Sequence, residues 1–343
     1  MKDDKELDEI FEEGTRANLT KVVRKAKWHS ILRNTAISIV AAIIVLIGGT
    51  IFVREYTYSL ETPIQIAVDS FYKIAYPNEY IGTMARYHDI LSGKNTYTTY
   101  KSVEGKVVHT GQHEYSYGLF NDGSWIGTES PGILGQTWSE EDLKLPRYNA
   151  LGQREMVFFY PFIKYHIYRN DLSLLDEIPD DKYMEMALSF DKSYTIDEVN
   201  KLFPKNITLK WYWVDDLSKE EKEQHKTKTQ VALNGKSTVM DNPDVRSEKT
   251  AYGIKIYDEN GQPYPQIETN FIWALHNGKE TKSKYTTEFE RVYNNIAGTD
   301  AKLTKDDFGI EGVVVTGNKQ MLESLKGLPF IKASSLGVVT EKY

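Results

Sequence analysis

Thr35 to Val53 read TAISIVAAIIVLIGGTIFV, nineteen residues without a charged side chain, bounded by Arg33 and Arg54. As a helix this stretch would be about 28 Å long, close to the ~30 Å thickness of the hydrocarbon core of a bilayer. The alternative is a buried core helix, but such helices seldom run this long without a polar face. The sequence therefore predicts one transmembrane helix at residues 35–53.

The residues around this apolar stretch indicate its processing and its orientation. About thirty residues precede it and no small-x-small motif follows it, which favours an uncleaved anchor over a signal peptide. One basic residue, Arg54, follows it closely, whereas five precede it: Lys21, Arg24, Lys25, Lys27 and Arg33. By the positive-inside rule we expect a single-pass protein of the cell membrane with a cytoplasmic N-terminus and an extracytoplasmic C-terminal part.

Four segments follow from this arrangement: a cytoplasmic segment at 1–34, the span at 35–53, and extracytoplasmic regions at 54–170 and 171–343. The outer part is long enough for a sizeable core. The chain has no cysteine, which excludes a disulfide scaffold and a thiolate metal site. Its net charge is −7 and its outer part shows no basic stripe with interleaved aromatic residues. These features argue against nucleic-acid binding.

The first fourteen residues, MKDDKELDEIFEEG, combine an apolar face with many acidic side chains. Leu7, Ile10 and Phe11 have the i, i+3, i+4 spacing of one helix face, and Gly14 is expected to interrupt or end that helix. Such a short segment has nothing of its own to pack against. Two interpretations stay open: a solvated, disordered tail, or an amphipathic segment that folds into a groove on a basic cytoplasmic partner.

Between the span and residue 170 the pattern changes from helix to strand. Thr62 and Pro63 suggest an N-cap and first helical position, before a helix that ends ahead of Pro77, and a second short helix is expected over 79–91. Residues 95–125 read as strands around a Glu104-Gly105 turn, and 127–155 read as loop. The apolar run MVFFYPFIKYHIY (156–168) fits either a strand or a buried helix.

Strand–helix–strand order occurs twice in the C-terminal region. Strands are expected at 183–190 and 207–214, with a helix from a capping box at Thr195 to Phe203 between them. The order recurs as a strand at 310–316, a helix from Asn318 to Leu325, and a strand within 330–339. Residues 217–250 read as a surface insertion, 251–257 as a strand, 286–296 as a helix, and 267–279 stay ambiguous. We predict an α+β fold whose C-terminal unit holds two βαβ-like, ferredoxin-like segments.

No pattern in the chain points to catalysis. His109 and His113 have the spacing of a helical metal pair, but their surroundings read as strand, where they would lie ~13 Å apart. The acidic pairs at 215–216 and 306–307 fit turns or helix starts, and no nucleophile, zinc-protease or phosphate-binding motif occurs. We therefore expect no enzyme activity, no cofactor and no metal.

Several core motifs resemble the sigma factor regulators, membrane-anchored anti-sigma proteins of Gram-positive bacteria. They are MALSFD (186–191), WYWVD (211–215), NFIWAL (270–275) and GVVVTG (312–317), within a resemblance that covers roughly 170–340. Residues from about 20 to 110 resemble the N-terminal domain of the same family. The resemblance implies a regulator of an extracytoplasmic-function sigma factor active in envelope stress. The zinc-binding His-x₃-Cys-x₂-Cys pattern of other anti-sigma domains is missing, since the chain has no cysteine.

Together these observations predict an anti-sigma factor whose cytoplasmic segment sequesters a sigma factor in response to a cell-envelope signal. Leu7, Ile10 and Phe11 would bind the partner, and a second small membrane protein is a further expected partner beside the lipid bilayer. The first alternative is a wall-binding or envelope interaction protein that uses exposed Tyr and Trp. The second is a membrane-tethered hydrolase. Neither alternative needs an acidic amphipathic segment at the N-terminus, so the sequence favours the anti-sigma factor.

Overall fold

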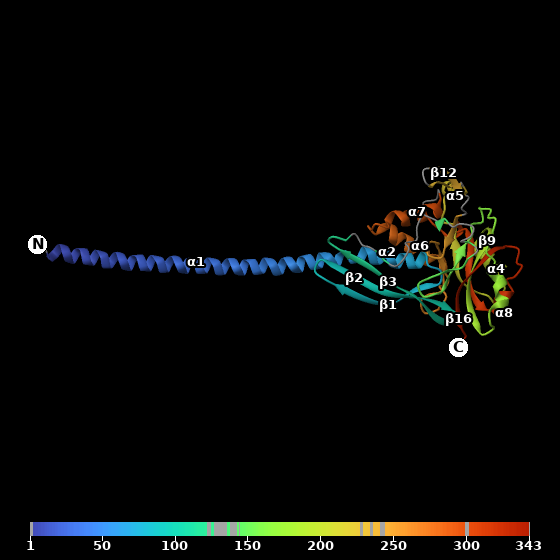
Figure 1. The fold of residues 1–343 in the computed structure, drawn as a ribbon, viewed down its shortest axis with the longest axis horizontal. Coiled ribbons are helices and arrows are strands. Elements are labelled where there is room, and N and C mark those ends of the chain that lie inside the picture. Colours follow the sequence, from blue (N-terminus) through green and yellow to red (C-terminus); the bar gives the residue numbers. More distant parts are fainter. Residues whose placement is uncertain are drawn as a thin grey trace. The chain divides into compact units, whose positions relative to one another are not determined.

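The structure is a computed structural model, and its elements are shown in Figure 1. It describes residues 3–121, 125–126, 136–137, 143, 145–226, 229–233, 236–240, 244–298 and 302–342. Side chains are described for 19–121, 143, 145–226, 244–298 and 302–342. The chain forms two compact units, residues 1–57 and residues 58–343, which are taken in turn below.

The first unit is helical and contains the apolar stretch. Helix α1 (Asp3–Ser59) includes both the acidic N-terminal segment and residues 35–53 in one element. The predicted break at Gly14 is wrong, because the helix continues through it. One glycine in a helix costs only about 1 kcal/mol relative to alanine, and the Glu, Lys, Arg and Leu residues around it are strong helix formers.

The second unit begins with α2 (Glu61–Ile74), which packs an apolar face into the core. Ile64, Val68, Phe71 and Ile74 are buried on this face, at the spacing that the sequence predicts. The N-cap position is Leu60 rather than the predicted Thr62. Pro63 still lies in the first turn, where its missing N–H leaves no helical hydrogen bond unmade.

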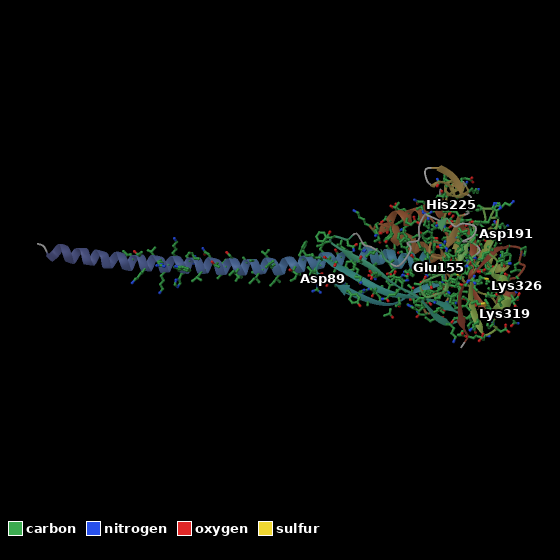
Figure 2. All side chains as sticks on the ribbon, viewed as in Figure 1. Asp89, Glu155, Asp191, His225, Lys319 and Lys326 are labelled. Atoms are coloured by element: carbon green, nitrogen blue, oxygen red, sulfur yellow. The ribbon has the colours of Figure 1, made fainter. Side chains whose placement is uncertain are left out.

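A four-stranded antiparallel sheet follows, in the order β1-β2-β3-β4. Its strands are β1 (Glu79–His88), β2 (Ser92–Val103), β3 (Lys106–Gly118) and β4 (Trp125–Ile126). Glu104 and Gly105 both have positive φ, which confirms the predicted turn between β2 and β3. Figure 2 shows Asp89, in the β1–β2 connection, at the end of this sheet remote from Lys319 and Lys326.

The helix predicted for residues 79–91 is wrong, because residues 79–88 form β1 and 89–91 belong to the turn that follows it. Its register runs from Glu79 opposite Lys101 to His88 opposite Gly93. Tyr80, Ile81 and Tyr87 favour strand, and pairing along the whole length of β2 outweighs the local helical spacing.

The second sheet has the order β14-β10-β15-β9-β16, and every adjacent pair is antiparallel. Its strands are β9 (Lys182–Tyr194), β10 (Thr208–Val214), β14 (Gly253–Lys255), β15 (Ile310–Asn318) and β16 (Ile331–Glu341). Because β9 and β10 both pair with β15, they run parallel to each other on its two sides. In the same way β15 and β16 run parallel on the two sides of β9.

The connecting helices begin where the sequence predicts. Helix α4 (Ile196–Leu202) starts at Thr195, whose side chain forms a complete capping box with Glu198. Helix α8 (Lys319–Glu323) starts at Asn318, whose side chain accepts a hydrogen bond from the Met321 amide. The ambiguous residues 267–279 lie in α6 (Ile267–Glu280), and α7 (Thr286–Ala297) confirms the helix predicted at 286–296.

Alternating side chains of the five-stranded sheet pack into two separate hydrophobic cores, one on each face. On β10, Tyr212 and Val214 pack in the larger core with α2, α4, α6, α7 and α8, whereas Trp211 and Trp213 pack in the smaller one. The smaller core is completed by Met156 to Tyr160. Both faces of this sheet are therefore buried.

Residues 156–168 and the predicted insertion pack together. Residues 157–158 form the short strand β8 (Val157–Phe158), which pairs with β13 (Asp244–Ser247). The residues from 159 to 168 have no helix or strand, and four of them are buried: Phe159, Tyr160, Ile163 and Tyr165. The surface assignment of 217–250 is therefore wrong for 244–247, where Val245 and Arg246 are fully buried. The cause is a non-local strand pairing, which leaves no periodic signal within the segment itself.

The remaining elements are short. They are β5 (Gln136–Thr137), β6 (Arg147–Tyr148), β7 (Arg154–Glu155), η1 (Asp171–Glu177), α5 (Lys219–Lys226), β11 (Thr229–Leu233), β12 (Lys236–Met240) and η2 (Lys305–Asp307). Strands β11 and β12 form a hairpin, and β5 pairs with β13.

The packing of α2 is open to a direct test through Phe71. This side chain is fully buried and stacks on Phe289 of α7 with ring centroids 4.4 Å apart. Phe71→Ala is expected to lower the free energy of unfolding of the second unit by ~3–5 kcal/mol. Val107→Ala, at a position that is 70% exposed, is expected to change it by less than ~0.5 kcal/mol. Urea unfolding of the detergent-solubilised chain, followed by tryptophan fluorescence, measures both values; equal effects would contradict this packing.

Candidate functional site

The residues predicted to bind a partner lie near the start of α1. The backbone of Leu7, Ile10 and Phe11 is helical, so their spacing directs the three residues to one side of the helix. Their side chains lie outside the described residues.

The apolar stretch of α1 has the character of a membrane segment. In the part of the chain that the structure describes, one helix is long and apolar enough to cross a membrane, and its apolar window has no buried residue. Ile44 and Leu46, for example, are 65% and 69% exposed. Because a core helix would bury such side chains, this exposure agrees with a bilayer environment.

The two predicted histidines lie on one strand. His109 and His113 both belong to β3, and His113 Nε2 lies 3.1 Å from the Thr99 hydroxyl. Among the described side chains, no group of three His, Asp or Glu residues could hold a metal ion.

A buried cluster of three charges links the four-stranded sheet to the five-stranded sheet. Lys101 of β2 donates hydrogen bonds to Glu185 Oε2 of β9 at 2.8 Å and to Glu248 Oε2 at 2.9 Å. The Lys101 and Glu185 side chains are 2% and 0% exposed. Asn78, at a positive φ, donates from Nδ2 to Glu185 Oε1 and to the Ser102 carbonyl. Each carboxylate of this ion triad therefore has a charged hydrogen-bond partner.

Burial and charge act in opposite directions on the ion triad. Burial disfavours the charged form of Lys101, but the Glu185 and Glu248 carboxylates outweigh it and raise the lysine pKa above its ordinary value. Burial is also the largest effect on Glu248; Lys101 opposes it and Glu185 adds to it, and the pKa of Glu248 rises from 4.5 to about 7. Lys101 thus stays charged at neutral pH, whereas Glu248 takes up a proton near neutral pH.

No local pattern in the sequence predicts the ion triad. Lys101 and Glu185 are 84 residues apart in the chain, so no local spacing joins them. One signal was present: Glu185 lies inside the apolar strand YMEMALSF, where a charged residue facing a buried side needs a partner. The identity of that partner depends on the register of two different sheets.

A second buried charge cluster joins the 244–247 strand to α7. Asp216 is 1% exposed and receives hydrogen bonds from Arg246 Nη2 at 3.3 Å and Arg291 Nη2 at 2.8 Å. Arg246 also donates to the Tyr160 hydroxyl, within the smaller core. These contacts explain why β13 is buried although its surroundings in the sequence are polar.

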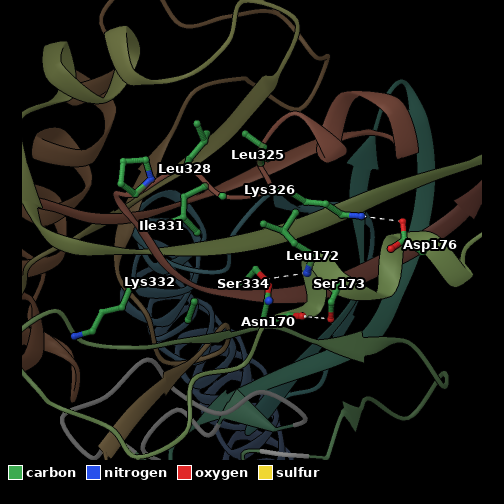
Figure 3. Close-up of a pocket in the computed structure, with 13 residues that line it drawn as sticks. Asn170, Leu172, Ser173, Asp176, Leu325, Lys326, Leu328, Ile331, Lys332 and Ser334 are labelled. Atoms are coloured by element: carbon green, nitrogen blue, oxygen red, sulfur yellow. Dashed lines mark hydrogen bonds and ion pairs between the residues drawn. The ribbon is translucent and has the colours of Figure 1, made fainter.

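Two of the cavities in the described part of the second unit are lined by several polar residues. The larger is an open groove of about 530 Å³ between η1, the segment after α8 and the start of β16 (Figure 3). Within it, Lys326 pairs with Asp176 at 2.9 Å and the Leu172 amide donates to Ser334 Oγ at 3.0 Å. The smaller cavity, about 210 Å³, is lined by residues that include Glu79, His113 and Glu248.

Removal of the central cation tests the role of the ion triad. Lys101→Met leaves Glu185 charged and buried without its cation, and is expected to lower the free energy of unfolding by ~3–5 kcal/mol. Lys94→Met is the matched control on the same strand; Lys94 pairs with Glu114 at 3.2 Å and is 49% exposed, so its loss is expected to cost under ~1 kcal/mol. The same urea titration measures both variants, and similar costs would mean that the triad does not stabilise the unit.

The raised pKa of Glu248 predicts a pH dependence of stability. Between pH 4.5 and about 7 the folded chain holds a proton on Glu248 that the unfolded chain has lost. Its stabilising contribution is therefore full below pH 4.5 and decreases as the pH rises through this window. The Gln side chain of Glu248→Gln cannot titrate. Between these pH values the free energy of unfolding is therefore expected to fall less in this variant than in the wild type, and the difference is up to ~3 kcal/mol. Glu290→Gln, at an exposed position of α7, is expected to keep the wild-type slope, measured by urea unfolding across the pH range.

Comparison with known proteins places both units in one family. The description Sigma factor regulator N-terminal matches residues 20–108, which include the apolar stretch, α2, β1 and β2. The description Sigma factor regulator C-terminal matches residues 175–338, which include the five-stranded sheet up to β16. No curated protein and no solved structure matches the chain significantly. On these two matches, the chain belongs to the sigma factor regulator family, as a single-pass membrane protein of the anti-sigma type.

Proposed function

We propose that this protein sequesters an extracytoplasmic-function sigma factor at the cell membrane and releases it in response to a cell-envelope signal. The observation that carries the proposal is the family match on both sides of the apolar stretch, in a chain whose N-terminal segment is acidic and helical. Sequestration at the membrane needs a sigma-binding segment on the cytoplasmic side and a sensing part on the other side. The chain has one short and one long part to fill these two roles.

The orientation follows from the basic residues. Five Lys or Arg residues closely precede the apolar stretch and Arg54 alone follows it closely, so residues 1–34 are cytoplasmic and residues 54–343 extracytoplasmic. Within the outer part we keep the division into 54–170 and 171–343.

The proposed contact is made by Leu7, Ile10 and Phe11, which dock into an apolar groove on the sigma factor. The acidic residues around them complement the basic surface with which a sigma factor binds DNA, so binding of the segment and of DNA would exclude each other. A segment of 34 residues offers a small interface. This small size is the reason to propose a second small membrane protein as a co-regulator.

The outer unit is proposed to transmit its signal as one body. The Lys101–Glu185 pair joins the sheet of the N-terminal family match to the sheet of the C-terminal match. Helix α2 is packed in the same core, next to the end of α1 in sequence. A ligand that moves the outer unit therefore acts on the membrane helix through residues 58–60, by displacement or by a change in oligomeric state.

We also propose that the five-stranded sheet is a ferredoxin-like unit with a long insertion. The order β16-β9-β15-β10, with two parallel pairs connected through α4 and α8, supports this assignment. The insertion lies between β10 and β15 and contributes β14, α6 and α7.

The proposed contact with the sigma factor is tested with substitutions on the two sides of the N-terminal helical segment. The full-length protein in lipid nanodiscs is titrated with a purified sigma factor whose gene adjoins this one, by calorimetry. The wild type is expected to bind with micromolar affinity or tighter, and Ile10→Asp/Phe11→Asp at least ~100-fold more weakly, since two apolar anchors are lost. Glu9→Asp/Glu12→Asp also introduces two aspartates, but on the opposite side of the helix and without a change in charge, and is expected to bind like the wild type.

A transcriptional reporter completes this test in cells. Loss of binding in the apolar-face variant should activate the regulon of the sigma factor. If Ile10→Asp/Phe11→Asp binds like the wild type and the regulon stays silent, the proposed contact is wrong. If deletion of residues 1–34 also changes no transcription, direct sequestration is wrong and the wall-binding alternative is favoured.

A further inference from the structure

Five large apolar side chains are exposed together at one end of the four-stranded sheet. They come from the end of β1, the β1–β2 turn and the residues after β3. A hydrogen bond from the Leu119 amide to the Leu91 carbonyl at 3.0 Å joins the turn to the residues after β3. We name this group the tip patch; its members and exposed fractions are Tyr87 (59%), Ile90 (44%), Leu91 (48%), Leu119 (36%) and Phe120 (91%). Contiguous exposed apolar surface of this kind marks an interaction site.

The tip patch is fixed beside the first residues of the second unit. The rings of His88 and Tyr58 lie 4.8 Å apart, so the strand that ends at the patch contacts the segment that enters the unit. Tyr117 donates to Glu61 Oε2 at 3.1 Å, and Arg86 Nε lies 3.6 Å from Glu61 Oε1. Neighbours of the patch on β1 and β3 are thus bonded to the start of α2.

Tyr58 is tethered closely to the membrane span. Tyr58 is only five positions after Val53, the end of the apolar stretch. Five residues extend about 7.5 Å as a helix and at most about 17 Å when fully extended. Whatever the angle between the two units, the surface around Tyr58 therefore stays within reach of the headgroup region of the bilayer.

We propose that the tip patch docks onto the lipid bilayer, with Phe120, Leu119 and the β1–β2 turn inserted at the level of the headgroups. Its composition fits this partner: a tyrosine and a phenylalanine with aliphatic side chains, on a surface that the chain holds next to the membrane. Docking gives the outer unit a second attachment besides α1. The inference rests on the membrane span and not on the sigma contact, so either can fail without the other.

The same sheet supplies a matched control position at its opposite end. Val107 is the second residue of β3, next to the turn between β2 and β3; it is apolar and 70% exposed. Gly118, at the other end of β3, is eleven positions further along, which corresponds to about 36 Å along a strand. A sheet that docks by its tip therefore holds Val107 in water.

The chain has no cysteine, so one introduced cysteine carries a spin label without background. Phe120→Cys and Val107→Cys are each labelled in the full-length protein and reconstituted into vesicles of phosphatidylglycerol and phosphatidylethanolamine. Electron paramagnetic resonance then compares collision of the label with oxygen, which concentrates in lipid, and with a water-soluble nickel complex. We expect a label at 120 to have at least a tenfold higher ratio of oxygen to nickel accessibility than a label at 107.

A charged tip provides the second arm of the test. A label at Tyr87→Cys is expected to have a lipid-like ratio in the wild-type background and a water-like ratio when Leu119→Asp and Phe120→Asp are added. Water-like ratios at both 120 and 107 would overturn the proposal, as would lipid-like ratios at both positions. Protection of position 120 from both reagents would mean that a protein covers the patch, which also overturns lipid docking.

Discussion

The second unit depends on one lysine ammonium held between two carboxylates in its interior. Lys101 comes from the four-stranded sheet, Glu185 from an inner strand of the five-stranded sheet, and Glu248 from the chain that follows β13. Buried charges of this kind add little stability over well-packed apolar groups. They do disfavour other arrangements of the sheets, because each wrong pairing leaves an unpaired charge in a low-dielectric environment. The triad thus selects one arrangement of two sheets that otherwise meet through few elements.

Local rules predicted the parts of this fold that are local. The apolar stretch, the capping box at Thr195, the Asn318 cap and the Glu104-Gly105 turn each depend on a few neighbouring residues, and each lies where the sequence indicates. Two assignments failed because contacts from elsewhere in the chain decided them: residues 79–88 pair with β2 as a strand, and 244–247 pair with β8 in the interior. The predicted break at Gly14 failed for a local reason, because the residues around it are strong helix formers.

The candidate sites divide in the same way. Leu7, Ile10 and Phe11 follow from helical periodicity in a short segment, so sequence alone identifies them as candidates. Lys101, Glu185 and Glu248 do not, because their relation is a property of the assembled sheets. The tip patch is intermediate: its apolar residues are visible in the sequence, but only the pairing of β1 with β2 and of β2 with β3 brings the two connections together.

The order of the five-stranded sheet has a consequence for biogenesis. Strand β9 is flanked by β15 and β16, although more than a hundred residues separate its end from the start of β15. Such non-local pairings form slowly, because a long loop must close before any contact is gained. While the chain is synthesised, both edges of β9 stay unpaired until β15 and β16 have been made. A chain truncated before Ile331 would keep one open edge, which a protease or chaperone can recognise. Strand β16 therefore makes folding of the second unit conditional on synthesis through residue 341.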